Sequence, residues 1–504
     1  MITLRNFKTP YPNLHDYGDW HACPGVKKST ECIPIQKERE KDKQKYTDRL
    51  LYCTKTDLSW IICLYKAKVL DRNTAAAVIY GLKKLLSSEQ TGRGGEASLI
   101  PVLDNNEDLG SLINLGRTMQ EPMSRLQMRD QMIDFFDFYI EFLSGIADFI
   151  EANIDTIMPG HTHFSQANPI TLANYYLSIY DNMYRGLEQL ELSYRLINKN
   201  SGGCGATSGT VWPVDRNLLT CLLGFDELLE VTYDCEASQD HTLHLVCSLA
   251  NIVNTLSKAT MDVEIWGLEE IDMMRIDRVW GGVSSMMPQK CHNGGFPEDL
   301  RNAICDVLGI MNTCMFRTKA EPHGDVMSMF CMPNIGIQAL ADTKAIIRTS
   351  AVMLRNLQPQ KEKMLEHVRL GYSCMTEVVV HLVRELGYGG RRAHRICAHL
   401  VRLARDRNIK APDLTGEMLD EAARLCEEEP PRIDTAALQK CLDPVEFIKN
   451  HNNLGGPAPS ETKRMLKQRK EMIRIAEEKQ QERRKRIKQG DELLEKEISA
   501  ICGK

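Results

Sequence analysis

Residues 126–154, LQMRDQMIDFFDFYIEFLSGIADFIEANI, decide the fold class of this chain. Apolar residues recur along the segment three or four positions apart, which places them on one face of an α-helix. An unbroken helix of this length is unusual in compact globular packing and typical of a long helical bundle. The segment therefore predicts an all-α molecule built around long helices.

Other segments with the same helical period follow this one, separated by short breaks rich in glycine and proline. They cover residues 171–199, 241–268 and 297–316, and few stretches alternate as strands would. Together they predict a long central helical bundle at residues 109–357.

Smaller helical domains are expected on both sides of this bundle, at residues 1–108 and 358–459, because the periodic segments there are shorter. A charged helical tail follows at residues 460–504. Acidic and basic residues lie side by side in the tail, which favours a solvated helix or coiled-coil arm over a segment that binds an acidic partner.

The composition is that of an ordinary soluble protein. The chain has 504 residues, of which 26% are charged and 43% are hydrophobic, and its net charge is -5. The slight acidity argues against nucleic acid as a partner. The sequence has neither an apolar run long enough to cross a membrane nor a signal-peptide core at its start, so we expect a cytoplasmic protein without a membrane partner.

The 17 cysteines are scattered, and no two of them form a C-x-x-C pair. Most lie inside apolar, helix-like stretches, as Cys247, Cys305 and Cys397 do. This distribution favours small buried side chains in a reducing compartment over a zinc site or a disulfide framework.

A polar, non-periodic segment, GGVSSMMPQKCHNGGFPE at residues 281–298, interrupts the helical pattern. Such a loop within a helical protein is more often functional than a plain linker, although a surface loop is the simpler alternative. Ser284 could serve as a base only if its alkoxide were stabilised. The cation of Lys290 and the N–H groups of the loop could stabilise it.

The segment SSMMPQK at 284–290 resembles the signature loop of the fumarase/aspartase superfamily, whose argininosuccinate lyase branch has SSLMPQKKN followed by Leu-Glu. The resemblance implies that Ser284 is the catalytic base and that Lys290 binds a substrate carboxylate. The family's asparagine is matched by Asn293 and its glutamate by Glu298. This alignment requires one inserted residue at 291–292.

Two further polar residues of the loop, Ser285 and Gln289, are expected to contact the substrate through the same resemblance.

The segment MPGHTHFSQANP at 158–169 resembles the MPGYTHLQxAQP segment of the same branch. The resemblance implies that Thr162 binds substrate and that His163 is the catalytic histidine, held by the glutamate of the loop. Without the family, a histidine before an apolar helix would be read as a capping or core residue. His161 replaces the family's tyrosine and is expected to be a neighbour of the catalytic groups.

Two more segments extend the resemblance. SGGCGATSGTVWPVDR at 201–216 resembles a glycine-rich turn of the branch, and residues 371–404 resemble its C-terminal domain. The resemblance therefore runs from about residue 57 to residue 459.

The chain departs from the family in two segments that address the amine part of the substrate. The family's GRSRND is GRTMQE at 116–121, where Arg117, Thr118 and Gln120 are expected to bind substrate. The segment whose tyrosine and glutamine hold the arginine end is here EPHGDVM at 321–327. His323 and Asp325 are expected to bind the amine part of the substrate there. Alternatively, the alignment slips and a tyrosine from elsewhere fills the gap.

The resemblance implies a fumarase/aspartase-type fold and a homotetramer whose active sites are shared between subunits. It implies a carbon–nitrogen lyase that converts an N-substituted aspartate, argininosuccinate or an analogue, to fumarate plus an amine or guanidine by anti-elimination. No metal or organic cofactor is expected. The departures suggest that argininosuccinate is a poor or merely acceptable substrate.

Three alternatives remain at this point. A lyase for another N-substituted aspartate, such as ethylenediamine-disuccinate, stands nearly equal with the first interpretation. A non-catalytic relative of the crystallin kind is less favoured, because Ser284, Lys290 and His163 are all present. Adenylosuccinate lyase fits the loop and the C-terminal segment less well.

Overall fold

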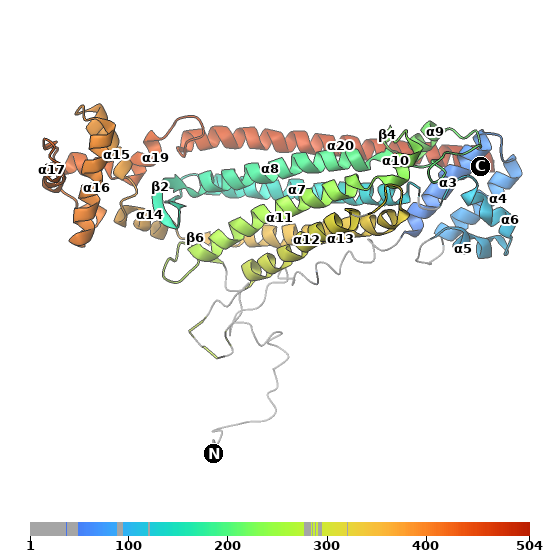
Figure 1. Cartoon of the computed structure of the whole chain (residues 1–504), viewed down its shortest axis with the longest axis horizontal. Helices are drawn as coiled ribbons and strands as arrows, with labels where there is room; N and C mark the ends of the chain where they lie inside the picture. The colour runs from blue at the N-terminus through green and yellow to red at the C-terminus, as the bar shows by residue number, and fades with distance from the viewer. Residues whose placement is uncertain are drawn as a thin grey trace, which may run out of the picture.

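The computed structural model describes Lys37 and residues 49–87, 94–118, 121–276, 284, 286–287, 289–290, 295–319 and 321–503. Long helices lie side by side along the longest axis of an elongated molecule (Figure 1). The predicted all-α bundle is therefore confirmed.

The helices are α3 (Leu50–Lys66), α4 (Arg72–Leu86), α5 (Glu96–Leu99), η1 (Ile100–Leu103), α6 (Glu107–Gly110), η2 (Ser111–Asn114), α7 (Met123–Ala152), α8 (Leu172–Ile197), α9 (Arg216–Leu222), α10 (Thr232–Ala237), α11 (Asp240–Trp266), α12 (Phe296–Thr318), α13 (Val326–Arg355), α14 (Lys361–Leu370), α15 (Met375–Arg384), α16 (Gly390–Asp406), η4 (Ala411–Asp413), α17 (Gly416–Leu425), α18 (Thr435–Cys441), α19 (Pro444–Asn450) and α20 (Pro459–Cys502). The short strands are β1 (Ile157–Thr162), β2 (Ser165–Thr171), β3 (Lys199–Asn200), β4 (Glu227–Leu228), β5 (Met274–Ile276) and β6 (Leu357–Pro359).

The bundle consists of α7, α8, α11, α12, α13 and α20, which pack along one continuous apolar core. Phe136, Tyr139 and Tyr180 are fully buried in it. Each such side chain contributes roughly 1.5–3 kcal/mol through the area that it removes from water. The Tyr139 hydroxyl donates to the carbonyl oxygen of Met183 at 2.7 Å, so its burial leaves no polar atom unpaired.

A second apolar core lies at the end of the bundle where α7 begins. It is formed by α3, α4 and α9 together with the last turns of α20. Trp60 is fully buried there, and its indole N–H donates to the Leu115 carbonyl oxygen at 3.0 Å. A third core joins α14 to α19 at the opposite end. The domain boundaries drawn from the sequence stay a prediction.

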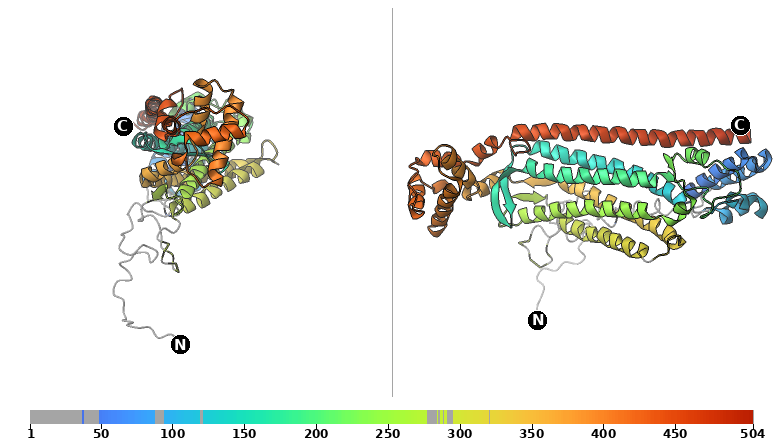
Figure 2. Two further views of the ribbon diagram at one scale, coloured as in Figure 1. Left: turned by 90° about the vertical axis from the view of Figure 1, so that its left-hand side faces the viewer. Right: turned by 45° about the horizontal axis from the view of Figure 1, so that its top comes forward.

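Helix α20 differs from the expected solvated arm, and that interpretation of the tail is wrong. The helix runs along the whole bundle (Figure 2). It adds Met465 and Ile473 to the central core, and Leu494 and Ile501 to the core beside α3 and α4. The apolar stripe is masked in the sequence by the charged residues of the opposite face, which dominate the composition of the segment.

Polar contacts from the middle part of α20 to neighbouring helices fix its position against the bundle. The buried amide of Gln480 donates to the Ile133 carbonyl oxygen at 2.6 Å and to Asp137 at 2.9 Å. The Arg469 guanidinium pairs with Asp181 at 2.7 Å. Since these partners lie on α7 and α8, the helix is a member of the bundle.

The cysteines follow the expected burial only in part. Cys397 is buried and Cys247 is half-buried, but Cys305 is exposed on α12, contrary to the expectation. In the described part of the chain, no helix is both long and apolar enough to span a lipid bilayer.

Candidate active site

The predicted catalytic histidine lies at the tip of a β-hairpin at one end of the bundle. Strands β1 and β2 pair antiparallel, with Thr162 opposite Ser165, so His163 and Phe164 form a two-residue turn. Their φ angles are 52° and 54°, the left-handed values that a type I′ turn requires. Non-glycine residues adopt such angles at a cost of about 1 kcal/mol or more, which is typical of functional positions.

Both turn residues are exposed, and Phe164 is 95% exposed. Thr162 ends β1 and is exposed as well. The hairpin therefore presents His163 outward from the end of the bundle, where groups of another chain can reach it.

A pocket of about 1090 Å³ lies behind this hairpin, between β1, α8, α11 and α14. Its walls include Trp266 and the hydrogen-bonded pair Tyr175–Asp262, whose oxygens are 2.5 Å apart. His161 lies on the same wall, and burial lowers the pKa of its imidazole. This lowering favours the neutral imidazole, and His161 lies beside Thr162 and His163 in the same hairpin.

The loop that contains Ser284 surrounds the serine oxygen with backbone donors. The N–H groups of Met286 and Met287 donate to Ser284 Oγ at 3.3 and 3.0 Å. Donors aimed at a hydroxyl oxygen stabilise the alkoxide that forms when the hydroxyl loses its proton. The Lys290 N–H donates to the Met287 carbonyl oxygen at 3.1 Å, and the Lys290 side chain is exposed, as Gln289 is.

The predicted residues Ser285 and Asn293 lie outside the described residues.

Glu298 lies in the first turn of α12 and is exposed. Near it, Arg301 of α12 pairs with Glu264 of α11 at 2.9 Å, so α12 begins at the hairpin end of the bundle. Glu298 and His163 nevertheless make no hydrogen bond or ion pair with each other, and both are described residues. Within one chain, the expected glutamate–histidine contact is not formed.

Arg117 has a different environment from the one expected of a substrate-binding residue. Its side chain is buried, and its guanidinium pairs with the buried carboxylate of Asp57. It also donates to the backbone carbonyl oxygen of Ile113 at 2.8 Å and lies 5.9 Å from the Trp60 ring centroid. Because the guanidinium is buried and paired with Asp57, these contacts favour a structural role in shaping the segment 116–121.

Thr118 fits the expectation better, because its buried hydroxyl oxygen has no hydrogen-bond partner among the described residues. Gln120 lies outside them.

Glu121 is the residue of this segment that the sequence did not single out. Its carboxylate accepts the backbone N–H groups of Gly203 and Ala206 at 3.0 and 2.9 Å, and that of Thr118 at 3.3 Å. It therefore ties the segment 116–121 to the glycine-rich turn at 201–209. In that turn, a Cβ atom at Gly205 would lie 2.1 Å from the Gly209 carbonyl oxygen, which explains the glycine.

His323 and Asp325 lie in the turn between α12 and α13. Asp325 caps α13 by accepting the Met327 N–H at 3.1 Å. His323 faces Tyr233 of α10, with ring centroids 5.8 Å apart. A Cβ atom at Gly324 would lie 2.3 Å from the Tyr233 hydroxyl, so the tyrosine closes directly over this turn.

Tyr233 is a neighbour of His323 that the sequence alone did not indicate. It fits the alternative in which a tyrosine from elsewhere fills the gap. It is 47% exposed, so its hydroxyl is accessible to a ligand. A distance of 91 residues along the chain separates it from Gly324, and no local pattern links the two.

The predicted site residues fall into two groups at opposite ends of α7. The segment 116–121 precedes α7, and the hairpin with His163 follows it. The 30 residues of α7 hold these groups about 45 Å apart, at 1.5 Å per residue. One substrate of ordinary size cannot contact both groups in one chain.

Comparisons with known proteins identify similar sequences over most of the chain. The family model described as lyase matches residues 69–309, and the model of the argininosuccinate lyase C-terminal region matches residues 372–449. The argininosuccinate lyase of Methanocaldococcus jannaschii is 27% identical over 459 residues, covering 87% of this chain and 91% of that protein. The argininosuccinate lyase of Methanothrix thermoacetophila is 28% identical over 452 residues, covering 86% and 89%.

Solved structures share the fold. EDDS lyase in complex with formate superposes with a TM-score of 0.85 at 24% identity, covering 95% of this chain and 97% of that chain. The class II fumarase of Schistosoma mansoni gives a TM-score of 0.63 at 15% identity, covering 83% and 96%. The two family models and the curated relatives show that this chain is a carbon–nitrogen lyase that is similar to argininosuccinate lyases over most of its length.

Proposed function

We propose that this enzyme eliminates the amine or guanidine from an N-substituted aspartate and releases fumarate. Argininosuccinate is the first substrate to test, because both of the relatives named above are argininosuccinate lyases. Cleavage of that substrate would place the enzyme in arginine biosynthesis. The proposed setting is the cytoplasm.

The pair of N–H groups on Ser284 Oγ is the observation that carries this proposal. The proton next to a carboxylate is only weakly acidic, so its base must be strong and the resulting dianion must be stabilised. A serine with two backbone donors on its oxygen fits the base. Lys290 and Asn293 would hold the carboxylate on which negative charge develops.

In the proposed reaction, Ser284 takes a proton from the carbon beside one carboxylate. The electron pair left on that carbon forms the C=C bond of fumarate as the adjacent C–N bond breaks. His163 supplies the proton to the leaving nitrogen, directly or through a water molecule. Thr162, Gln289 and Ser285 would bind the succinyl part. No metal or organic cofactor enters any of these steps.

We further propose a homotetramer in which each active site takes residues from different subunits. The separation of about 45 Å across α7 supports this assembly, because the two groups of residues can meet only between chains. The exposed His163 and Phe164 at the hairpin tip are consistent with coverage by a neighbouring subunit. Glu298 would then orient His163 from another subunit.

The amine part would be read at the end of the bundle where α7 begins. Thr118, His323, Asp325 and Tyr233 would supply polar groups there, and the sequence adds Gln120 as a further candidate. Asp325 favours a cationic amine, and the Tyr233 hydroxyl offers a donor beside it. Arg117 would act there through the shape of its segment.

Fumarate release from a panel of N-substituted aspartates, followed by ultraviolet absorbance, tests the proposal. The panel contains argininosuccinate, ethylenediamine-disuccinate and adenylosuccinate. At least one of the first two should be cleaved with kcat/KM above about 10⁴ M⁻¹s⁻¹, the lower range for ordinary enzymes. No fumarate from any member, with a tetrameric and folded enzyme, would instead support the non-catalytic alternative.

A further inference from the structure

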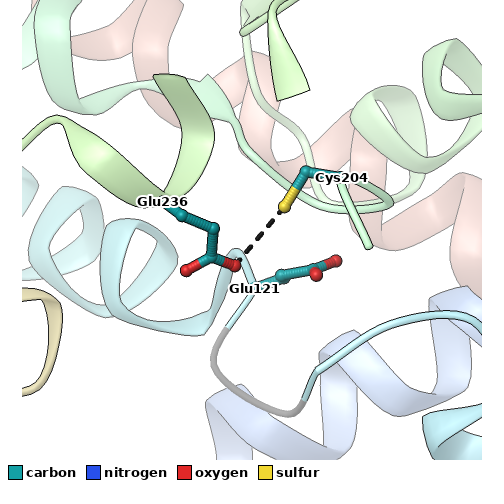
Figure 3. Close-up of side chains that lie close together, drawn as sticks. All are labelled: Glu121, Cys204 and Glu236. Carbon is teal, nitrogen blue, oxygen red and sulfur yellow. Dashed lines mark hydrogen bonds between the residues drawn. The ribbon is translucent and has the colours of Figure 1, made fainter. Parts of the chain in front are cut away.

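A second cluster of reactive side chains is buried far from His163 and Ser284. Glu121, Cys204 and Glu236 come from three separate segments and meet in the interior (Figure 3). Glu121 precedes α7, Cys204 lies in the glycine-rich turn, and Glu236 lies on α10. The proposed elimination uses none of these three side chains.

The geometry of the cluster is that of a set of metal ligands. One ligand atom from each residue lies within 4.8 Å of the other two. Cys204 Sγ and Glu236 Oε1 are 3.5 Å apart. A tetrahedral zinc ion with Zn–S of about 2.3 Å and Zn–O of about 2.0–2.1 Å requires a sulfur–oxygen separation of roughly 3.5 Å. Two of the three ligands therefore already stand at the spacing that zinc demands.

The two carboxylates of the cluster are buried without a basic side chain as a partner among the described residues. All three residues are at most 2% exposed. Among the described residues, no lysine or arginine pairs with either carboxylate, and Glu236 Oε2 has no hydrogen-bond partner at all. Arg117 donates to the backbone carbonyl oxygen of Glu121, not to its carboxylate. Burial, and then the negative charge of Glu121, raise the pKa of Glu236 to about 7, so two ionised carboxylates are costly here and a bound cation would offset that cost.

We propose that Glu121, Cys204 and Glu236 bind a structural zinc ion. A thiolate and two carboxylates carry three negative charges, which Zn²⁺ reduces to one. The Cys204 thiol, which donates to Glu236 Oε1 in the metal-free arrangement, loses its proton to solvent as the Zn–S bond forms. Backbone N–H groups of Gly203 and Ala206 would hold Glu121 in place as a ligand.

Zinc at this site would fasten together three segments that surround the proposed amine-binding end. These are the segment with Thr118, the glycine-rich turn and α10, which also contributes Tyr233. The role goes beyond the proposed elimination, because the ion stabilises the fold and enters no chemical step. Loss of zinc and loss of lyase activity are therefore separate outcomes.

Metal content tests the proposal. The full-length protein without an affinity tag is produced in zinc-supplemented medium, dialysed, and measured by inductively coupled plasma mass spectrometry. We expect about one zinc ion per chain in the wild type and in Cys397→Ser, which alters an equally buried cysteine of the C-terminal core. The variants Cys204→Ser and Glu236→Gln should retain less than a fifth of that amount.

Thermal unfolding supplies a second readout. Wild-type protein from zinc-depleted medium should unfold at a lower temperature than the zinc-loaded protein, whereas Glu236→Gln should show no difference between the two media. Cobalt in place of zinc should give a thiolate-to-cobalt absorption band that Cys204→Ser lacks. Wild-type protein without zinc, equal zinc in Glu236→Gln, or equal loss in Cys397→Ser would each overturn the proposal.

Discussion

Two backbone N–H groups donate hydrogen bonds to the side-chain oxygen of a single residue, Ser284. Replacement by alanine removes the proposed base. We expect Ser284→Ala to lower kcat by a factor of about 10³ or more, with an unchanged tetramer and unchanged substrate binding. Fumarate-release kinetics and isothermal titration measure the two effects. Ser87→Ala, at an exposed helix end, is the control. Activity within a few-fold of wild type would exclude Ser284 as the base.

Tyr233 provides a second prediction at this scale, because its hydroxyl closes over the turn at His323. A site that hydrogen-bonds a polar group loses affinity when that partner is removed. Tyr233→Phe should raise KM for the preferred substrate about tenfold and change kcat little. Tyr80→Phe, which alters an exposed tyrosine of α4, should have no effect. An unchanged KM would show that Tyr233 does not bind the amine part of the substrate.

His241, the first core residue of α11, makes the stability depend on pH. Burial, and then the nearby positive charge of Arg125, lower the pKa of its imidazole from 6.5 to about 4. The unfolded chain takes up a proton below pH 6.5, while the folded chain does so only near pH 4. Stability is therefore complete above pH 6.5 and falls as the pH decreases to 4, by roughly 3 kcal/mol. In His241→Gln, the unfolding midpoint should change less with pH across this range than in the wild type. An unchanged pH dependence of the midpoint would contradict the assignment of this effect to His241.

Helix α20 is the element whose role the packing changes most. As a solvated arm, it could be deleted with most activity retained. As a bundle member, its loss would expose both the central core and the core beside α3 and α4. Deletion of residues 461–504 is therefore expected to leave the protein unfolded or aggregated, as circular dichroism and gel filtration would report.

A paired substitution on the same helix tests this without a deletion. Ile473 is 6% exposed and Ile475 is 40% exposed. Ile473→Ala should lower the free energy of unfolding by about 2–5 kcal/mol, the usual cost of such a cavity. Ile475→Ala should cost far less. If chemical denaturation showed the same loss in the free energy of unfolding for both variants, α20 would be a solvated arm and not a member of the bundle.

The shared site is tested at the scale of the whole molecule. His163→Asn should reduce turnover by a factor of about 10²–10⁴. When this variant and Ser284→Ala exchange subunits, some sites receive an intact residue from each parent, so activity should partly return. Subunits mixed without exchange serve as the control. Native mass spectrometry establishes that mixed tetramers form, and their lack of activity would argue against sites built between chains.

Local sequence determined the long helices and the non-periodic segment at Ser284, because each depends on residues within one segment. The hairpin with His163 was not predicted from the sequence and appears only in the structure. Helical period is a property of neighbours, and it identified α7, α8, α11 and α12 within a few residues. The residues that we propose as catalytic lie in two short motifs, which can be recognised at low overall identity.

Only the tertiary structure decided which distant segments meet. Asp57 pairs with Arg117, which lies 60 residues away in the sequence, and Glu121 accepts a hydrogen bond from the turn 85 residues later. The apolar stripe of α20 packs against two cores. No periodicity or motif encodes such pairs, since they arise from how the helices pack against one another. For the same reason, no local pattern indicates that Arg117 pairs with Asp57, that Tyr233 packs over Gly324, or that Glu121, Cys204 and Glu236 meet, because the partners of these side chains are set by folding.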